Sequence, residues 1–181
     1  MSAASGGPAP GRRIAATLSR FRVFAGFVAG AFVLWWSTPT LQSVGAGAAV
    51  AGVGEALRLW AAGHLEKSRE VTSSGPYRWF AHPLYLGSSV MGAGLAIASW
   101  SVAASALIGI YLVVAFTSAA RREEAFLQRA FGDRYERYRG GAVDATRRFS
   151  WARVGANHEY RALIGFLLAV GVLALKAVRT V

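Results

Sequence analysis

The sequence contains no cysteine, and several common catalytic and ligand-binding motifs are missing as well. The absence of cysteine from all 181 residues excludes disulfide bonds, thiolate metal sites and cysteine nucleophiles. No glycine-rich phosphate-binding loop follows a strand pattern, which excludes a classical nucleotide-binding fold, and no GxSxG nucleophile elbow occurs. The histidines at positions 64, 82 and 158 lack the helical spacing of metal ligands, as in HExxH, so we expect no metal site.

Acidic residues are scarce. The chain has 9 Asp and Glu against 20 Lys and Arg, which gives a formal net charge of +11. In a soluble protein this balance would suggest a nucleic-acid partner, but 54% of the chain is apolar and the basic residues flank long apolar runs. We therefore predict an integral membrane protein whose basic residues contact anionic lipid headgroups, with no nucleic-acid partner.

The longest stretch without a charged side chain runs from Pro83 to Ala120. At about 1.5 Å of rise per helical residue, each half of it is long enough to cross much of a bilayer core of roughly 30 Å. A turn at Ser99–Trp100–Ser101 would return the chain to the membrane face from which it started. The polar cluster Gly75–Gly87 and the charged cluster Arg121–Glu124 would then meet at one interface, where we expect a reaction site.

Apolar runs elsewhere extend this pattern to an all-α, polytopic membrane protein with about five transmembrane helices. In the segment Arg121–Arg139, apolar residues recur at helical spacing between arginines, so we expect it to continue the fourth span as a cytoplasmic amphipathic helix. Residues 1–20 are expected to be disordered and residues 21–181 to form one helical domain. The expected spans are about Phe21–Ser37, Thr40–Ala62, Leu84–Ser99, Ser101–Ala120 and Ala162–Lys176.

The distribution of Lys and Arg predicts the orientation in the membrane. Basic residues precede the first span and recur in the segments Arg58–Arg78 and Arg121–Arg161, whereas the turns Thr38–Ser43 and Ser99–Ser101 have none. The positive-inside rule then places the N-terminus and the candidate site in the cytoplasm. Lys176, after the last apolar run, would lie on the opposite side, against the rule.

Two groups of side chains are candidates for the site. Proline is favoured at the first position of a helix, so the third span is expected to begin at Pro83, with His82 at its N-cap and Tyr85 on the same face. Glu123 and Glu124 directly follow the uncharged run. Because adjacent side chains on a helix diverge, we expect only one carboxylate to face the site and the other to pair with an arginine.

A second pair of charges lies near the end of the second span. Glu55 and Arg58 are three residues apart, so they either form an internal ion pair or line the same cavity.

Three segments, GHLEK, TSSGPYRWFAHPLYLG and REEAFLQRAFGDRYERY, resemble the integral-membrane methyltransferases over about Glu55–Tyr138. That group includes isoprenylcysteine carboxyl methyltransferase and the phospholipid N-methyltransferases. The form of the motif with leucine after His-Pro looks most like the small bacterial proteins of the group. The resemblance implies an enzyme of a bacterial inner membrane that transfers a methyl group from S-adenosylmethionine to a lipophilic acceptor, either a lipid or a prenylated compound. Such a transfer depends mainly on positioning and on the exclusion of water.

The resemblance also implies a set of site residues. The cofactor pocket would be lined by Tyr77, His82, Pro83, Leu84 and Tyr85, and 69–72 would add backbone contacts. Glu123, or Glu124 if the helix is turned, would hold the polar end of the cofactor. His82 or Tyr85 would help to remove a proton from an amine acceptor. The eukaryotic prenylcysteine enzymes have an arginine where this chain has Ala119, so the resemblance does not extend to a prenylcysteine carboxylate.

Two other functions remain open at this point. Membrane reductases with a nicotinamide cofactor share a related helical core, and Arg121–Arg139 would then clamp the phosphates of the cofactor. A non-enzymatic scaffold or lipid-binding protein is the other alternative. It predicts that alanine at Tyr77, His82 or Glu123 changes stability only.

Overall fold

The computed structural model describes residues 26, 28–67, 70–141 and 147–180, and this part of the chain contains helices and connections without a strand. The all-α prediction is therefore confirmed for the described residues. The predicted disorder of residues 1–20 and the start of the first predicted span lie outside them. Residues 28–36 are helical. The further elements are α2 (Leu41–His64), η1 (Gly75–Arg78), α3 (Pro83–Ser99), α4 (Val102–Phe131), α5 (Asp133–Arg139), α6 (Trp151–Ala156) and α7 (Tyr160–Arg179).

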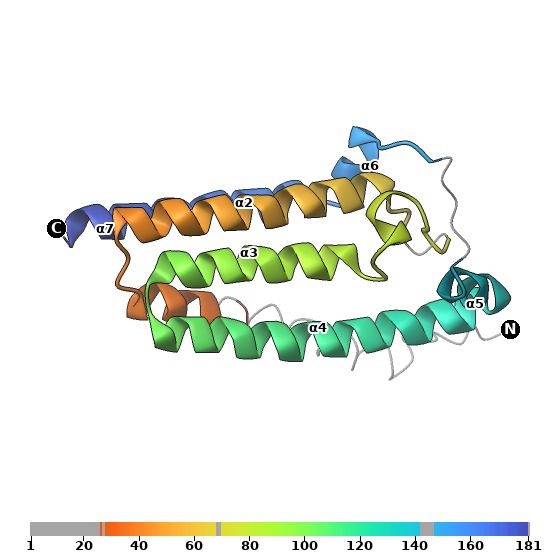
Figure 1. The fold of residues 1–181 in the computed structure, drawn as a ribbon, viewed down its shortest axis with the longest axis horizontal. Helices are drawn as coiled ribbons and strands as arrows, with labels where there is room; N and C mark the ends of the chain where they lie inside the picture. Colours follow the sequence, from red (N-terminus) through yellow and green to blue (C-terminus); the bar gives the residue numbers. More distant parts are fainter. Residues whose placement is uncertain (1–25, 27, 68–69, 142–146, 181) are drawn as a thin grey trace, which may run out of the picture.

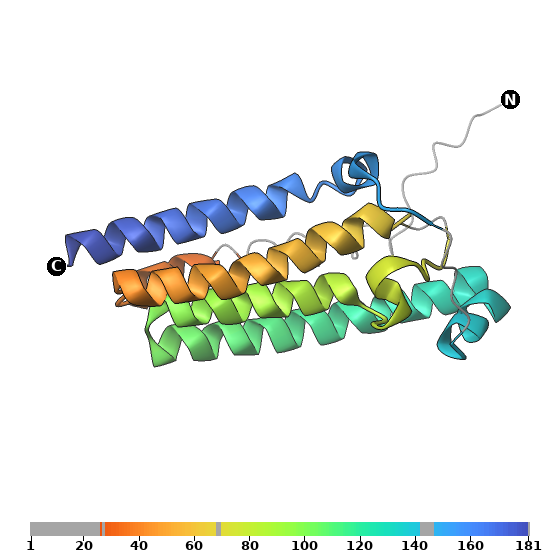
Figure 2. The same cartoon turned by 45° about the horizontal axis from the view of Figure 1, so that its top comes forward.

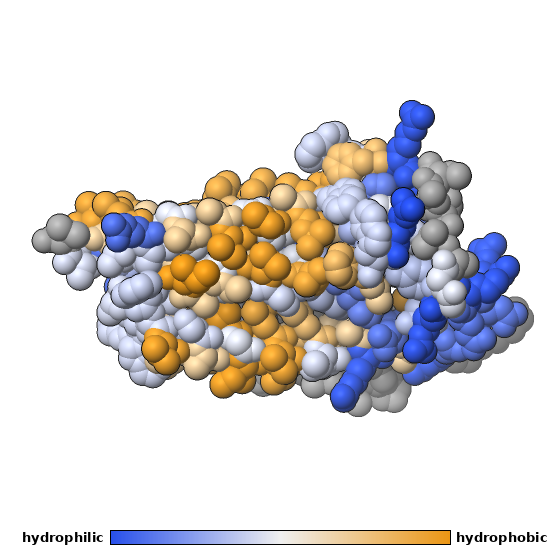
Figure 3. Space-filling view, in the orientation of Figure 1, coloured by the Kyte–Doolittle hydropathy of each residue, from blue (hydrophilic) through white to orange (hydrophobic). Residues whose placement is uncertain are grey.

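The long helices form an elongated bundle. Helices α2, α3 and α4 lie side by side and alternate in direction (Figure 1). Helix α7 packs along α2 and runs antiparallel to it (Figure 2). The short elements η1, α5 and α6 gather at one end of the bundle, and the C-terminus lies at the other. Apolar side chains cover the middle of the face in Figure 3, and hydrophilic ones gather at the end with the short helices.

The predicted start of the hairpin and its predicted turn are both confirmed. Helix α3 begins at Pro83 with His82 as its N-cap. It ends at Trp100, whose left-handed backbone (φ 48°) reverses the chain. Ser101 then caps α4, because its hydroxyl accepts a hydrogen bond from the backbone N–H of Ala104. The turn therefore follows from two local signals, a left-handed residue and a serine cap.

Helix α4 continues beyond the apolar run, as predicted, but it does not reach Arg139. It spans 30 residues and ends at Gly132, which has a positive φ of 39°. Helix α5 starts at the next residue and turns aside. The prediction of one unbroken amphipathic helix over Arg121–Arg139 is therefore wrong at Gly132, because a left-handed glycine stops the helix there.

Two described helices, α4 and α7, are long and apolar enough to cross a membrane by length and composition. Helix α3 is apolar but has only 17 residues. Helices also form at 28–36 and in α2, where spans were expected, yet neither meets the same criteria. Five transmembrane helices are therefore not confirmed, whereas membrane association agrees with the two apolar helices.

Helices α2 and α3 touch through glycines spaced seven residues apart on each helix. A Cβ atom added to Gly47 would lie 2.4 Å from the carbonyl oxygen of Gly94. One added to Gly54 would lie 2.5 Å from the carbonyl oxygen of Gly87. The two backbones are therefore in direct contact at two levels, a mode of packing favoured in membranes, where small residues allow close approach. This contact fixes α3 against the end of α2 that carries Arg58.

Lys176, the residue that the expected orientation would place against the positive-inside rule, has a structural role in the bundle. Its ammonium group donates to the carbonyl oxygens of Leu34 and Trp35, at 2.7 and 2.9 Å, and to the hydroxyl of Ser37 at 3.2 Å. These carbonyls end the helix over 28–36, where a cation is stabilised by the helix dipole. Lys176 therefore joins α7 to the first described helix.

Candidate functional site

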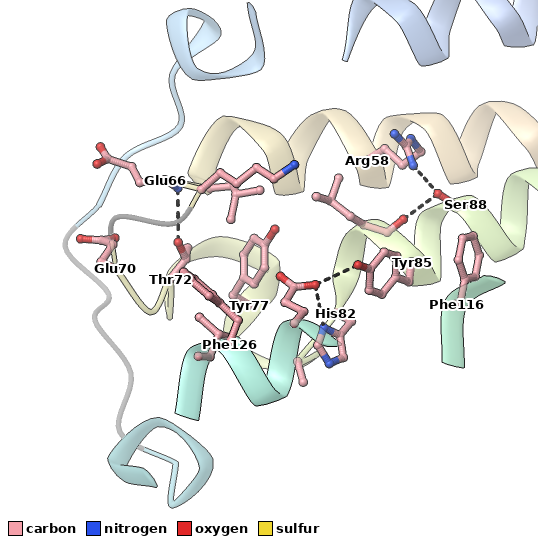
Figure 4. Close-up of a pocket in the computed structure, with 16 residues that line it drawn as sticks. Arg58, Glu66, Glu70, Thr72, Tyr77, His82, Tyr85, Ser88, Phe116 and Phe126 are labelled. Carbon is pink, nitrogen blue, oxygen red and sulfur yellow. Dashed lines mark hydrogen bonds and ion pairs between the residues drawn. The ribbon is translucent and has the colours of Figure 1, made fainter. Parts of the chain in front are cut away.

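A cavity of about 390 Å³ opens at the end of the bundle that carries the short helices. Its walls come from the end of α2, the following loop, η1, the start of α3 and the second half of α4 (Figure 4). The lining residues are Arg58, Leu65, Glu66, Lys67, Glu70, Thr72, Tyr77, Ala81, His82, Leu84, Tyr85, Ser88, Phe116, Glu123, Phe126 and Leu127.

The hairpin brings Tyr85 and Glu123 together inside this cavity. The Tyr85 hydroxyl donates to Glu123 Oε2 at 2.9 Å, and His82 Nδ1 lies 3.7 Å from the same oxygen. The Tyr85 ring also stacks on Phe116, with centroids 5.2 Å apart. These contacts join the first turn of α3 to α4. The two clusters on either side of the uncharged run therefore meet, as the sequence predicted. Figure 4 shows Tyr85 and His82 directed at one carboxylate.

Glu124 lies outside the cavity. Its carboxylate is half exposed and pairs with His82, with Oε1 3.2 Å from Nε2. Only one of the two adjacent glutamates therefore faces the cavity, as predicted, and it is Glu123. The expectation that the other pairs with an arginine is wrong, because the imidazole of His82 lies between the two carboxylates.

The other predicted residues differ in their access to the cavity. Tyr77 and Leu84 line it, whereas Pro83 is fully buried as the first residue of α3. Burial, and secondarily the charge of Glu123, raises the pKa of Tyr77, so its phenol stays protonated. Tyr138 of α5 donates to the backbone carbonyl of Tyr77 at 2.8 Å. Helix α5 thus holds η1 in place against the cavity.

Arg58 lies at the inner end of the cavity within a buried group of charges. Its Nη2 lies 2.6 Å from Glu159 Oε2, its Nε lies 3.5 Å from Glu55 Oε2, and Nη1 donates to the Ser88 hydroxyl. The predicted ion pair between Glu55 and Arg58 is present, and of the two only Arg58 lines the cavity. Glu55 is 3% exposed, and neither of its oxygens accepts a hydrogen bond in the described structure.

The cavity is acidic although the chain is strongly basic. Three carboxylates line it, those of Glu66, Glu70 and Glu123, against the basic groups Arg58 and Lys67. The charge of Arg58 is matched by Glu55 and Glu159, and the charges of Glu66 and Glu70 are matched by Arg153 and Arg147. Glu123 is therefore the lining carboxylate best placed to attract a ligand that carries positive charge.

Several lining residues were not identified from the sequence. Ser88 and Phe116 could have been found by helical spacing, because Ser88 is three residues after Tyr85 and Phe116 is seven residues before Glu123. Glu66 gave no such signal, and Glu70 was predicted only as part of the 69–72 segment, for its backbone contacts. They are held by arginines of the segment around α6, with Glu66 3.9 Å from Arg153 and Glu70 paired with Arg147. Of the predicted 69–72 contact segment, Glu70 and Thr72 line the cavity and residue 69 lies outside the described residues.

Comparison with known proteins gives a match to one protein family over most of these elements. A model of a family described as phospholipid methyltransferase matches residues 21–134, which include α2, α3, α4 and most of the cavity wall. No solved structure gives a significant match. Within the described ranges, no group of three or more His, Cys, Asp or Glu side chains could hold a metal ion.

Two curated proteins are similar to part of the chain. The cobalt-zinc-cadmium resistance protein CzcN of Cupriavidus metallidurans is 32% identical over 99 residues, which cover 53% of this chain and 44% of the relative. The nickel-cobalt-cadmium resistance protein NccN of Alcaligenes xylosoxydans xylosoxydans is 32% identical over 99 residues, or 53% of this chain and 45% of the relative. The chain thus matches less than half the length of these relatives, and their names do not identify a substrate.

Proposed function

Because this chain belongs to the phospholipid methyltransferase family, we propose that it transfers a methyl group from S-adenosylmethionine to a lipophilic acceptor in the acidic cavity. The observation that carries this proposal is the contact of Tyr85 with Glu123 in the cavity wall. It is formed by residues 38 positions apart, from the two clusters on either side of the uncharged hairpin.

The residues of the cavity fit this cofactor. S-adenosylmethionine is a polar molecule with a positively charged sulfonium and an ammonium group, and the carboxylate of Glu123 complements such a charge. A volume of about 390 Å³ lies within the usual range for small-molecule sites. The rings of Tyr77, Tyr85 and Phe116 offer aromatic faces, which attract cations. Glu123 would hold the ammonium group, with Tyr77, His82, Leu84 and Tyr85 around it.

When bound, the cofactor would supply an electrophilic methyl group. The chain would position the cofactor and exclude water from it. The hydrogen bond from Tyr85 fixes the carboxylate of Glu123, so that little reorganisation is needed when the ligand arrives. Leu84 and Phe116 exclude water from the inner end, which strengthens the electrostatic interactions there. His82 has one carboxylate 3.7 Å from Nδ1 and another 3.2 Å from Nε2, so it would help to remove a proton from an amine acceptor by passing that proton on to one of them.

The positions of the aromatic side chains support a location of the cavity at a membrane interface. Five exposed tryptophans lie near the ends of the helices. Trp35 and Trp36 end the helix over 28–36 and Trp100 follows α3, away from the cavity, whereas Trp60 is in the last turns of α2 and Trp79 follows η1, near the cavity. Helix α2, which runs between these ends, has 24 residues and is about 36 Å long. Tryptophan is enriched at both interfaces of a bilayer, so two belts at this separation would bound its apolar core. The cavity then lies level with the headgroups on the basic, cytoplasmic side.

Cofactor binding to the purified protein in detergent tests the proposal. Isothermal calorimetry with S-adenosylmethionine is expected to detect binding to the wild type, and Glu123→Gln is expected to weaken it by about tenfold or more, the value of a charge-assisted hydrogen bond. Glu124→Gln is the matched control, because it changes the next residue of the same helix but lies outside the cavity. Absence of binding to the wild type, or equal losses in both variants, would contradict the proposed site.

Methyl transfer itself can be followed in membranes. Membranes that contain the protein are incubated with methyl-labelled S-adenosylmethionine and extracted with organic solvent. The label is expected in the lipid fraction, and chromatography of that fraction identifies the acceptor class. Label that appears equally with the Glu123→Gln variant would contradict a role of Glu123 in the transfer.

A further inference from the structure

The arginines of one segment, residues 147–157, form ion pairs with charged side chains of the main cavity. Arg147 pairs with Glu70. Arg153 lies beside Glu66, with Nη1 3.9 Å from Oε1. The segment includes α6 and follows the part of the chain that the family model matches. The family match therefore does not account for its contacts with the cavity.

Each of these two arginines is also tied to the end of α2. Arg153 Nε donates to the carbonyl oxygen of Gly63 at 2.7 Å, and Arg147 Nη1 donates to that of His64 at 3.4 Å. The last carbonyl groups of a helix have no partner within the helix, and a nearby cation is stabilised by the helix dipole. Each guanidinium group therefore joins a carboxylate of the cavity wall to the end of α2.

Contacts without charge dock the same segment on α2. The side-chain amide of Asn157 donates to the carbonyl oxygens of Ala62 and Leu65, both at 3.0 Å. The ring of Phe149 lies so close to Gly63 that a Cβ atom there would overlap it. A variant that loses the two arginine charges is therefore expected to keep the segment in place.

The two ion pairs act on only part of the charge in the cavity. Glu66 and Glu70 lie on one side of it, and Tyr85 lies on the other (Figure 4). Glu123, which accepts the hydrogen bond from Tyr85, pairs with His82 instead of an arginine among the described residues. The cavity thus has one carboxylate available beside Tyr85, whereas the carboxylates on the opposite side are paired with arginines.

The charge of the ligand changes during the proposed reaction. S-adenosylmethionine carries a sulfonium, an ammonium and a carboxylate group. In the transfer, a lone pair of the acceptor forms the bond to the methyl carbon, and the electron pair of the broken carbon–sulfur bond stays on sulfur. The product, S-adenosylhomocysteine, therefore has a neutral thioether but keeps the ammonium group. A carboxylate that holds the ammonium group does not distinguish donor from product, whereas an unpaired carboxylate elsewhere in the cavity does.

From this arrangement we propose that Arg147 and Arg153 determine the specificity of the cavity for donor over product. By pairing with Glu70 and Glu66, they reduce the preference of the cavity for the sulfonium cation. Positive charge leaves sulfur in the transition state, so unpaired carboxylates would stabilise the bound donor more than the transition state and would slow the transfer. This inference rests on the proposed function, because donor and product are those of that reaction.

Calorimetry with both compounds on the full chain in detergent tests the inference. The measured quantity is the affinity for S-adenosylmethionine divided by the affinity for S-adenosylhomocysteine. Arg147→Gln/Arg153→Gln leaves both carboxylates unpaired and is expected to raise this ratio about fivefold, the effect of two charges roughly 10 Å from the sulfonium and partly screened by water. Glu66→Gln/Glu70→Gln leaves the arginines unpaired and is expected to lower the ratio. The variant with all four substitutions is expected to restore the wild-type ratio, because its charges balance again.

A ratio of affinities separates a role in specificity from a role in structure, because a distorted cavity would bind both compounds more weakly. Arg148→Gln is the matched control. Arg148 is exposed in the same segment and forms no ion pair with a carboxylate among the described residues, so its loss is expected to leave the ratio unchanged. Because the two double variants shift the ratio in opposite directions, either one decides the question if the other fails to fold.

The same titrations distinguish failure of this inference from failure of the proposed function. A wild type that binds both compounds, with a ratio that a folded double variant leaves unchanged or that Arg148→Gln raises equally, would overturn the inference and leave the proposed function in place. A wild type that binds neither compound would contradict the proposed function, and this inference with it.

Discussion

Replacing Gly47 with alanine tests whether α2 and α3 are held by direct contact of their backbones. The added Cβ would lie 2.4 Å from the carbonyl oxygen of Gly94 and 2.5 Å from the backbone nitrogen of Ala98. Neither backbone atom can rotate away, so the helices must separate locally by about 1 Å to reach an ordinary contact distance. Overpacking of this kind costs about 1–3 kcal/mol.

Gly45→Ala is the matched control. Gly45 lies in the same helix, but a Cβ added there would meet no atom of a neighbouring element within 4 Å. Both substitutions gain the same helix propensity, up to about 1 kcal/mol, so the difference between the two variants isolates the steric cost. A difference of about 2 kcal/mol corresponds to roughly 4–8 °C in the unfolding temperature of a chain of this size. Thermal unfolding in detergent, followed by circular dichroism, measures it. Equal unfolding temperatures for Gly47→Ala and Gly45→Ala would refute the reasoning.

Three further changes probe the site and its support. Tyr85→Phe removes the hydrogen bond to Glu123 and is expected to weaken S-adenosylmethionine binding by about tenfold in calorimetry; unchanged affinity would mean that this hydrogen bond does not organise the cofactor site. Glu159→Gln removes the carboxylate closest to Arg58 in a buried charge group, so we expect a loss of about 3 kcal/mol in the free energy of unfolding, measured by denaturant titration; a loss below about 1 kcal/mol, typical of an exposed pair, would contradict the buried arrangement. Because burial raises the pKa of Tyr77 above its ordinary value of 10.0, its contribution to stability is full below pH 10.0 and shrinks as the pH rises further. Unfolding temperatures at pH 9 and 11 are therefore expected to differ less in Tyr77→Phe than in the wild type, and an equal difference would exclude this phenol as a source of the pH dependence.

The parts of the fold that the sequence predicted are those set by local signals. Pro83 begins a helix because its ring suits the first helical position, and Trp100 ends that helix next to a serine cap. From these two points, the meeting of His82 and Tyr85 with Glu123 follows by helix geometry alone. The sequence therefore predicted where these three side chains meet, whereas their roles in cofactor binding stay predictions.

The parts that were missed depend on contacts between distant segments. Arg58 and Glu159 are 101 residues apart, and nothing in the sequence around either residue indicates the other. The pairing of Glu124 with His82 instead of an arginine was missed because it depends on how α3 and α4 are rotated against each other. Gly132 was read as part of a continuous helical pattern, since an isolated glycine is often tolerated in one.

The turn at Trp100 also determines how closely Tyr85 and Glu123 can approach each other. Hydrogen bonds of Thr38 to the carbonyl oxygens of Ser99 and Trp100, at 2.9 and 2.8 Å, fix the turn at the far side of the bundle. Glu123 lies roughly 34 Å from this pivot along α4, so each degree of inclination between α3 and α4 displaces it from Tyr85 by about 0.6 Å. A few degrees of inclination between the two helices would therefore break the 2.9 Å contact between the two side chains, so the shape of the cavity wall depends on how rigidly this distant turn is held.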